Sequence, residues 1–389
     1  MIDLLDGDMY AGDPAPVYAW LREHAPAYHD EANGLWGISR HADISAIERD
    51  PKLWTSTVGY RPQLPSEPSM IGMDDPEHAE RRRIVYRRFT PRYVHARYAA
   101  RVREVVSEQL DRALEQGTVD AVAELAAPLP ARMIGWLLGF PDEDWPRLKH
   151  WSETTIVAGG GLRYVTHEAA VAAGEFGQAV LDLAAERRAG APAAHGDRDD
   201  LLSLWCASPA YDDEHLANEA LLLLDGGAET TRTVIATAID ALIRHPEQWR
   251  LLREDPESME GAIEEFIRWT TPILNMCRAA TRDTWLHGQQ IAKGQQVLLM
   301  YGSANRDPEV FADPGVFDVT RKPGGHIAFG LGTHFCLGAA LARLELRIFF
   351  EEWVARVRDA TWADDLGPRI LPNAFVRGVT SFPIELRPR

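Results

Sequence analysis

The segment FGLGTHFCLG, Phe329 to Gly338, places a cysteine, Cys336, among glycines and directly ahead of the stretch AALARLELRIFF. The second stretch has apolar residues at helical spacing, which predicts an amphipathic helix that begins just after Cys336. A helix N-terminus leaves backbone N–H groups unpaired and carries the positive end of the helix dipole, and both favour a thiolate over a thiol. We therefore expect a lowered pKa for the Cys336 thiol and a sulfur ready to bind a metal.

Three glycines of this segment, Gly330, Gly332 and Gly338, carry no side chain, so a flat cofactor and backbone N–H groups can come close to the sulfur. Two other interpretations remain open at this point. A buried structural cysteine in a glycine-rich turn is the commoner fate of this residue type. A zinc site is a second alternative, although His334 and Cys336 have no second Cys/His pair at finger-like spacing.

The composition is that of a folded globular protein, with 46% hydrophobic and 25% charged residues among 389. Forty-one Lys and Arg against 58 Asp and Glu give a formal net charge of −17, which disfavours nucleic acid as a partner. Three cysteines without a CxxC pair suit a reducing compartment. The first ten residues, MIDLLDGDMY, are acidic and resemble neither a signal peptide nor a stable membrane anchor, so we expect a cytoplasmic protein.

Most of the chain has the apolar periodicity of helices, so the predicted fold class is mainly α with a minor β portion. Short strands are expected at 35–39, at 296–300 and within 376–386. The stretch 189–200, AGAPAAHGDRDD, is predicted to be a loop inside a single domain that spans residues 1–389.

From Glu214 to Arg244 the sequence runs without proline for some thirty residues, which predicts one long helix of roughly 45 Å. Its centre, DGGAETT, places two glycines and several polar side chains where a buried helix should be most apolar. Glycine costs about 1 kcal/mol in a helix interior, and a buried carboxylate costs more without a partner. Such a local conflict points to function.

Four motifs together resemble those of the cytochrome P-450 monooxygenases, from about residue 10 to the end of the chain. FGLGTHFCLG is similar to the haem-thiolate loop of that family. GGAETT (226–231) looks like its oxygen-activating stretch, EEFIR (264–268) like its Glu-x-x-Arg helix, and HAERR (78–82) like its propionate-binding helix. The resemblance implies the fold of that family, with a long central helix over the haem and the cysteine loop beneath it.

The implied cofactor is haem b, iron protoporphyrin IX, held without a covalent bond because the sequence has no CxxCH motif. Cys336 would be the axial ligand of the iron, and a thiolate there favours O–O cleavage. His78 and Arg82, four residues apart on one helix face, would bind a haem propionate together. The full set of residues that the resemblance places at the haem is His78, Arg82, Gly227, Arg278, Phe329, His334, Cys336 and Gly338.

Glu229 and Thr230 would act as catalytic residues that relay protons to the oxygen molecule, as the resemblance implies. The alternative for Thr230 is a hydroxyl that bonds back to its own helix, and for Glu229 a carboxylate paired with a surface base. Glu265 and Arg268 would form a structural ion pair. The family completes that pair with an arginine at the position of Val316, so we expect Arg321 or Arg306 to replace it.

The predicted function is a monooxygenase that uses O2 and two electrons to hydroxylate a C–H bond of a hydrophobic small molecule. The remaining length leaves no room for a flavin domain, so a separate ferredoxin or flavodoxin with its reductase would supply the electrons. GAIEEFIRWTTPILNMCR and IAFGLGTHFCLG look most like actinobacterial members that hydroxylate sterol side chains, which suggests a steroid, another lipid or a terpenoid. Candidate residues of the substrate pocket are Met70, Ile71, Leu224, Ile273, Phe375 and Val376.

Two other functions are alternatives to oxygenation. A peroxide-driven or isomerising haem-thiolate enzyme of natural-product metabolism would not need Glu229 and Thr230, so their presence argues against it. A non-enzymatic haem-binding or lipid-binding protein would show no turnover with any redox partner.

Overall fold

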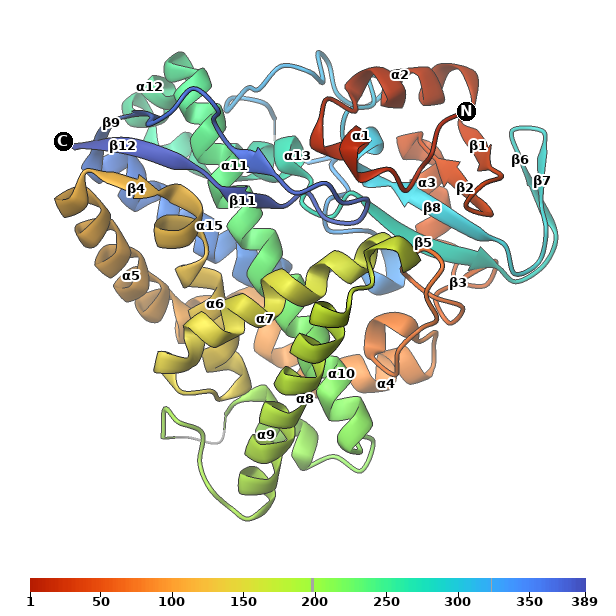
Figure 1. Cartoon of the computed structure of the whole chain (residues 1–389), viewed down its shortest axis with the longest axis horizontal. Coiled ribbons are helices and arrows are strands. Elements are labelled where there is room, and N and C mark those ends of the chain that lie inside the picture. The colour runs from red at the N-terminus through yellow and green to blue at the C-terminus, as the bar shows by residue number, and fades with distance from the viewer. Residues whose placement is uncertain (197–198, 323) are drawn as a thin grey trace.

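The computed structural model describes residues 1–196, 199–322 and 324–389. Helices gather around one long central helix, and a small sheet stands to the right of them in Figure 1. The prediction of a mainly α fold with a minor β portion is confirmed. Within the predicted loop 189–200, residues 197–198 lie outside the described part of the chain.

The α-helices vary from four to 26 residues, and the longest is α5. Their bounds are α1 Gly7–Ala11, α2 Ala15–His24, α3 His41–Glu48, α4 Glu77–Tyr86, α5 Pro91–Gln116, α6 Pro128–Leu138, α7 Trp145–Thr155, α8 His167–Arg188, α9 Leu201–Cys206, α10 Asp213–Leu224, α11 Thr230–Arg244, α12 Pro246–Glu254, α13 Met259–Thr270, α14 Tyr301–Ala304 and α15 Ala339–Arg356.

The main sheet has five strands in the order β1-β2-β8-β5-β3, and β2 pairs with β8 in parallel. The predicted strands are found at β2, β8, β11 and β12. The strand bounds are β1 Ala27–Asp30, β2 Leu35–Ile38, β3 Trp54–Thr55, β4 Thr118–Asp120, β5 Asn275–Ala280, β6 Thr284–Leu286, β7 Gln289–Ile291, β8 Gln296–Met300, β9 Val357–Trp362, β10 Arg369–Ile370, β11 Val379–Ser381 and β12 Pro383–Pro388.

The predicted long helix is present as α10 and α11, joined by one π-helical segment, η7 (Asp225–Glu229). It begins at Asp212, whose side chain accepts a hydrogen bond from the backbone N–H of His215. A π-segment inside an α-helix is common at functional sites. Gly227 is needed here for packing, because a Cβ on it would lie 2.3 Å from the side chain of Ile134 in α6.

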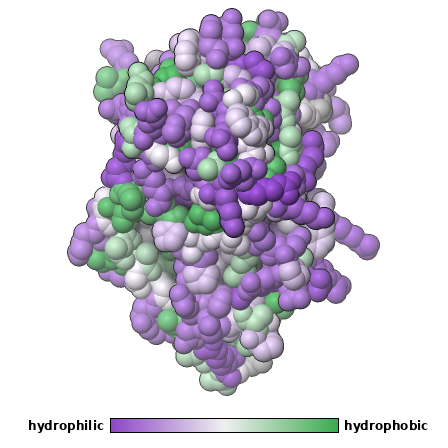
Figure 2. All heavy atoms as spheres, turned by 90° about the vertical axis from the view of Figure 1, so that its right-hand side faces the viewer, coloured by the Kyte–Doolittle hydropathy of each residue, from purple (hydrophilic) through white to green (hydrophobic). Residues whose placement is uncertain are grey.

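The main hydrophobic core lies where α5 and α15 pack together and where α11 contacts α13 and α15. Residues 121–138 are apolar and long enough to span a membrane, but 78% of that stretch is buried inside the protein. Figure 2 shows the face that lies on the right-hand side in Figure 1. This face is mostly hydrophilic, and its apolar residues form small groups. Burial in the core accounts for the apolar character of 121–138.

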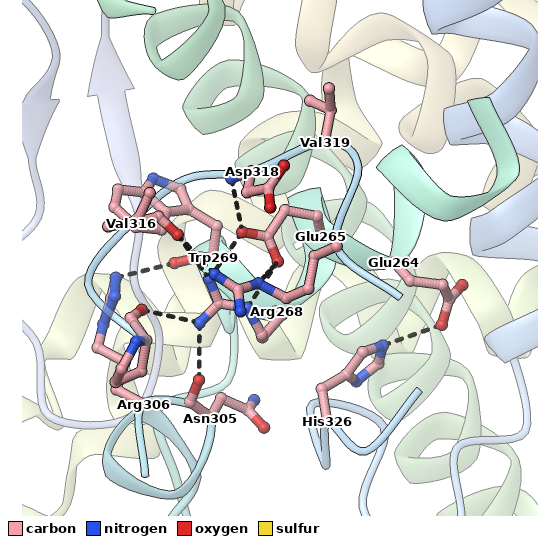
Figure 3. A network of polar contacts seen from close by, with 12 residues as sticks. Glu264, Glu265, Arg268, Trp269, Asn305, Arg306, Val316, Asp318, Val319 and His326 are labelled. Carbon is pink, nitrogen blue, oxygen red and sulfur yellow. Dashed lines mark hydrogen bonds and ion pairs between the residues drawn. The ribbon is translucent and has the colours of Figure 1, made fainter. Parts of the chain in front are cut away.

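A buried ion-pair network ties α13 to the segment that leads toward Cys336 (Figure 3). Arg268 donates two hydrogen bonds of 2.7 Å to the carboxylate of Glu265, and Nε of Arg321 donates a third at 3.1 Å. Val316, at the position of the missing arginine, contributes only its backbone oxygen. The structure thus assigns the replacement to Arg321, while Arg306 donates to the backbone of Trp269 instead.

The neighbouring glutamate of the same motif, Glu264, holds the cysteine segment and its helix. Its carboxylate accepts from Nε of Arg343 in α15 at 2.7 Å and lies 3.0 Å from Nε2 of His326. Adjacent residues of α13 therefore hold the chain before Cys336, at Arg321 and His326, and after it, at Arg343.

Arg321→Leu removes one hydrogen-bonding partner of a fully buried carboxylate. We expect a loss of about 2 kcal/mol in the free energy of unfolding, because a charged hydrogen bond inside the protein is lost. Urea unfolding measures it, and Arg250→Leu, which removes an exposed pair with Glu254, is the matched control with little change expected. Equal stability of the two variants would contradict the assignment of Arg321.

Candidate active site

A cavity lies beneath the central helix, between the cysteine loop and the loops around β3, β5 and the C-terminal strands. About 1630 Å³ within it, the open mouth included, is not filled by protein atoms. All eight residues that the sequence places at the haem line this one cavity. They are His78, Arg82, Gly227, Arg278, Phe329, His334, Cys336 and Gly338.

The cysteine loop folds back on itself, so that the backbone N–H of Cys336 donates to the carbonyl of Phe329 at 2.8 Å. Gly330 and Gly332 adopt φ of 65° and 64°, a left-handed conformation that favours glycine. A Cβ on Gly332 would also lie 2.2 Å from the backbone oxygen of Glu48 in α3. The glycines therefore serve the shape of the loop, while Gly338 leaves the space beside the sulfur open.

The expectation of a lowered pKa for the Cys336 thiol is wrong for the protein chain itself. Burial raises this pKa, and the opposing effects of the backbone N–H of Gly338 and the charge of Arg82 are smaller. α15 does begin just after the cysteine, at Ala339, as predicted. Desolvation at the floor of a closed cavity outweighs the helix end, and a metal cation at the sulfur would reverse the balance because it deprotonates a coordinating thiol.

One end of the cavity collects the imidazole and guanidinium groups. The rings of His78 and His334 lie 4.4 Å apart between their centroids, although the residues come from α4 and from the cysteine loop. Arg82 donates to the backbone oxygen of Phe335 at 2.6 Å, which fixes α4 against that loop. Arg278, on β5, lines the same cavity.

The two histidines are held in the neutral state. Burial, together with the charges of Arg278 and Arg82, lowers the pKa of His334 to about 2. Burial also lowers the pKa of His78, while Asp75, at 3.3 Å from its ring, opposes that shift. Neutral imidazoles beside two arginines form an end of the cavity that can donate hydrogen bonds to an anionic group.

A buried carboxylate completes this end, and the sequence analysis did not find it. Glu48 of α3 lies 3.5 Å from Arg278 and accepts a hydrogen bond of 2.5 Å from the hydroxyl of Tyr301. Burial raises the pKa of Glu48 despite these two partners. No local pattern marks Glu48, because its partners are more than two hundred residues away in the chain.

The two candidate catalytic residues of the central helix point in different directions. Thr230 lines the cavity, and its hydroxyl donates to the backbone oxygen of Gly226 at 2.6 Å. Glu229 is not among the lining residues of the cavity. Its carboxylate accepts from the hydroxyl of Ser152 at 2.8 Å and pairs with Arg232 at 2.5 Å. The Thr230 contact matches the alternative that the sequence left open, whereas Glu229 is paired with a buried arginine and not with the surface base of its alternative.

Four of the six candidate pocket residues line the cavity: Met70, Ile71, Ile273 and Phe375. Leu224 and Val376 do not, and both are buried in the hydrophobic core. Val376 follows Phe375 in extended chain, where successive side chains point to opposite faces. Leu222 and Leu223 line the cavity in place of Leu224.

The cavity also has lining residues that the sequence analysis missed, most of them aromatic or aliphatic. They include Tyr60, Arg61, Phe89, Ile134, Ile156, Leu222, Leu223, Asp225, Thr231, Val234 and Met276, together with the buried Glu345 of α15. The polar side chains of Asp225 and Arg61 stand out in this wall. The aspartate was visible in the DGGAETT stretch as a local conflict, whereas nothing near Arg61 in the sequence signalled its place.

These residues fit haem b. A single thiol at the floor suits an axial thiolate, two neutral histidines and two arginines at one end suit the propionates, and apolar walls suit the macrocycle. Cys336 would bind the iron, and His78, Arg82, Arg278 and His334 would bind the propionates. The fold and the site thus define a haem-thiolate protein.

Comparison with known proteins agrees with that class. A sequence model described as cytochrome P-450 matches residues 166–358. The steroid C26-monooxygenase of Mycolicibacterium smegmatis is 38% identical, over 100% of this chain and 96% of its own length. The steroid C26-monooxygenase of Mycobacterium tuberculosis is 39% identical, over 100% and 97%. The crystal structure of CYP109E1 from Bacillus megaterium with testosterone superposes with a TM-score of 0.88 at 29% identity, covering 97% and 99% of the two chains.

The chain belongs to the cytochrome P-450 family and is a haem-dependent monooxygenase. Its cofactor is haem b, and its substrate is a hydrophobic small molecule. Members of the family take electrons from a redox partner.

Cys336→Ser should abolish monooxygenase activity and remove the red-shifted Soret band of the reduced protein with carbon monoxide, since serine supplies no thiolate. The far-UV circular dichroism should change little. Cys206→Ser is the matched control, because Cys206 lies in α9 and does not line the cavity, and it should keep the band. A red-shifted band in Cys336→Ser would overturn the assignment of the ligand.

Proposed function

We propose that this protein hydroxylates a C–H bond of a bulky hydrophobic molecule, with a sterol side chain as the first candidate, in a single domain of residues 1–389. The observation that carries the proposal is the cavity itself. One thiol lies at its floor, four basic or imidazole side chains stand at one end, and apolar side chains form most of the wall. Haem b, when bound, supplies the activation of O2, with one oxygen atom inserted into the substrate and the other released as water.

The apolar wall of the cavity orients the substrate and excludes water from it. Ile71, Ile156 and Phe375 come from three separate segments and lie on this wall. Gly159 leaves room for the ring of Phe375, because a Cβ on that glycine would lie 2.3 Å from it. A wall of this kind selects by shape and apolar area, which supports a hydrophobic substrate.

Proton delivery is assigned to Thr230 and Glu229, which are adjacent in the helix. The hydroxyl of Thr230 is inside the cavity and bonded to the oxygen of Gly226, so it can pass a proton to a group in the cavity. Glu229 lies behind it, and burial raises the pKa of Glu229 although Arg232 opposes the shift. A buried acid with a raised pKa holds its proton more firmly than an exposed one, which suits a role in proton delivery.

The electron donor is proposed to be a separate ferredoxin or flavodoxin, acting with its reductase in the cytoplasm. Arg83 of α4 and Arg87, directly after that helix, are exposed near Arg82, which contacts the cysteine loop. A basic surface in a chain of net charge −17 is suited to an acidic protein partner. A donor protein that docks on this side would lie close to the sulfur of Cys336 when it transfers its electrons.

The substrate class rests on the similar proteins. Two relatives are named for the oxidation of steroids at C26, and a similar structure holds testosterone. The mostly apolar lining of the cavity supports a hydrophobic substrate of this kind. A peroxide-driven enzyme is the second candidate, and the Thr230 hydroxyl inside the cavity argues against it.

Turnover under ¹⁸O2 tests the function. The holoenzyme is reconstituted in parallel with a ferredoxin and a flavodoxin system and is given cholesterol, a branched fatty acid and a terpenoid hydrocarbon. We expect an alcohol that carries one ¹⁸O atom, detected by mass spectrometry. Product formation with hydrogen peroxide alone, and none with either redox system, would replace this proposal with the peroxide-driven alternative.

Thr230→Ala should continue to consume reductant but release hydrogen peroxide in place of product, because the hydroxyl that positions the proton is lost. A drop in coupling of roughly tenfold or more is expected, in the range that a positioned proton donor contributes. Peroxide and product are measured against NAD(P)H consumed. Thr233→Ala is the matched control on the same helix, as Thr233 is buried outside the cavity lining and should leave coupling unchanged.

A further inference from the structure

A polar pair interrupts the apolar wall of the cavity. Asp225, at the start of the π-segment, is 2% exposed, and the side chain of Arg61 is 10% exposed. Arg61 comes from the loop after β3, so the two residues meet across the cavity wall and not along one element. The distance from the guanidinium Nη2 of Arg61 to Oδ2 of Asp225 is 3.6 Å, which is an ion-pair distance but too long for a hydrogen bond.

Both members of the pair keep a hydrogen-bonding atom that nothing in the described part of the chain satisfies. Oδ2 of Asp225 is buried without a hydrogen-bond partner there, and so is Nε of Arg61. A buried polar atom without a partner costs about 1–3 kcal/mol, so such atoms call for an explanation. Both residues line the cavity, so this unused acceptor and this unused donor lie at its wall.

The charges around the pair select the kind of ligand. Glu67 lies 3.3 Å from Nη1 of Arg61, so the guanidinium already faces two carboxyl groups. A carboxylate ligand would be repelled by these two groups, and an ammonium would be repelled by Arg61. A neutral group that both donates and accepts a hydrogen bond fits, and a hydroxyl does so with one oxygen atom.

We infer that Asp225 and Arg61 form a recognition site for a hydroxyl group of the substrate, which donates to Oδ2 of Asp225 and accepts from Nε–H of Arg61. This inference rests on the proposed function, and it narrows the substrate to a hydrophobic alcohol. The alcohol is bound in the cavity by this hydroxyl and is oxidised at another carbon.

The position of the pair in the helix says where on the substrate this hydroxyl lies. Asp225 precedes Thr230 by five residues, about one turn of the π-segment that begins at Asp225. The hydroxyl is therefore close in space to the carbon that is oxidised. A sterol hydroxylated at the end of its side chain carries its ring hydroxyl at the opposite end of the molecule, so that hydroxyl does not meet the requirement, whereas a hydroxyl on the side chain does.

Thr155 occupies the other oxygen of the carboxyl group. Its hydroxyl donates to Oδ1 of Asp225 at 2.6 Å, and it also lies 2.7 Å from the backbone oxygen of Trp151. Burial raises the pKa of Asp225 to about 7, although Arg61 and Thr155 oppose the shift. Oδ2 is therefore the carboxyl oxygen that is left for a ligand hydroxyl.

Matched pairs of ligands test the inference on the ferric holoenzyme. The side-chain pair is 25-hydroxycholesterol against cholesterol, and the ring pair is cholesterol against 5-cholestene. A compact pair, 1-adamantanol against adamantane, repeats the comparison on a small skeleton. Dissociation constants come from the spin-state change of the haem, and thermal stabilisation provides a second readout of binding.

In the wild-type protein we expect 25-hydroxycholesterol to bind roughly tenfold or more tightly than cholesterol, the gain of one hydrogen bond to a buried charged group. In Asp225→Leu this ratio should fall to about one, because the acceptor is gone while Arg61 keeps Glu67 as its partner. Asp225→Asn, which keeps an acceptor oxygen of the same size, should retain most of the preference. The ring pair should show the same ratio in all three proteins.

The ligand-free proteins add a readout that does not depend on the ligand. Asp225→Leu should have a Tm equal to or above that of the wild type, because a buried group with an unused acceptor is removed. A hydroxyl preference that persists in Asp225→Leu, or that is absent from the wild type in both the side-chain and compact pairs, would overturn the inference. A lower Tm with an unchanged preference would assign the pair a structural role instead.

Binding and turnover separate this inference from the proposed function. The hydroxyl preference is measured without electrons or O2, so it holds or fails by itself. The proposed function fails when no ¹⁸O-labelled product forms with either redox system, whatever the ratio of the dissociation constants.

Discussion

The structure depends on holding one sulfur atom at the floor of a cavity that is otherwise closed by apolar side chains. A thiol in that position is poorly ionised by itself, since burial raises the pKa of Cys336 and the helix end does not compensate. The loop must therefore be fixed by the fold before any cation arrives. Glu264 and Glu265 fix it from α13, Arg82 fixes it from α4, and the left-handed Gly332 lets it pass close to α3.

Ionisable groups buried around the cavity fall into two kinds. Glu265 is fully bonded, with Arg268 and Arg321 both donating to it, and its role is to join segments of the fold. Glu48 and Asp225 each keep one carboxyl oxygen without a hydrogen-bond partner in the described ranges. A buried ion pair with all its hydrogen bonds made is accounted for by its role in the fold. A buried carboxyl group that keeps an unbonded oxygen at a cavity wall indicates a missing ligand atom. The end of the cavity that holds Glu48 would bind the haem propionates, and the wall that holds Asp225 would bind the substrate hydroxyl.

The sequence predicted most of the fold and the floor of the site because those features are encoded locally. A helix after Cys336, the long helix over 214–244 and the strand at 296–300 each follow from periodicity within one segment. The residues of the cavity wall were harder to predict from the sequence, because they depend on which side of a helix or strand faces inward. Leu224 lies on the face of α10 that is buried in the core, whereas Leu222 and Leu223 line the cavity. Arg61 could not be found, since its partner Asp225 is distant in sequence and the loop between β3 and α4 has no repeating pattern.

The stretch DGGAETT conflicts with the requirements of a buried helix, and the structure accounts for each departure by a different cause. Gly227 makes room for Ile134, Thr230 satisfies the oxygen of Gly226, and Glu229 is paired with Arg232 outside the cavity. Asp225 alone among these lies at the cavity wall with an acceptor that no described side chain uses. An apolar residue at that position would pack against the wall without the cost of a buried carboxyl group. The aspartate therefore favours recognition over stability, at a point of the helix where recognition of the substrate lies close to its oxidation.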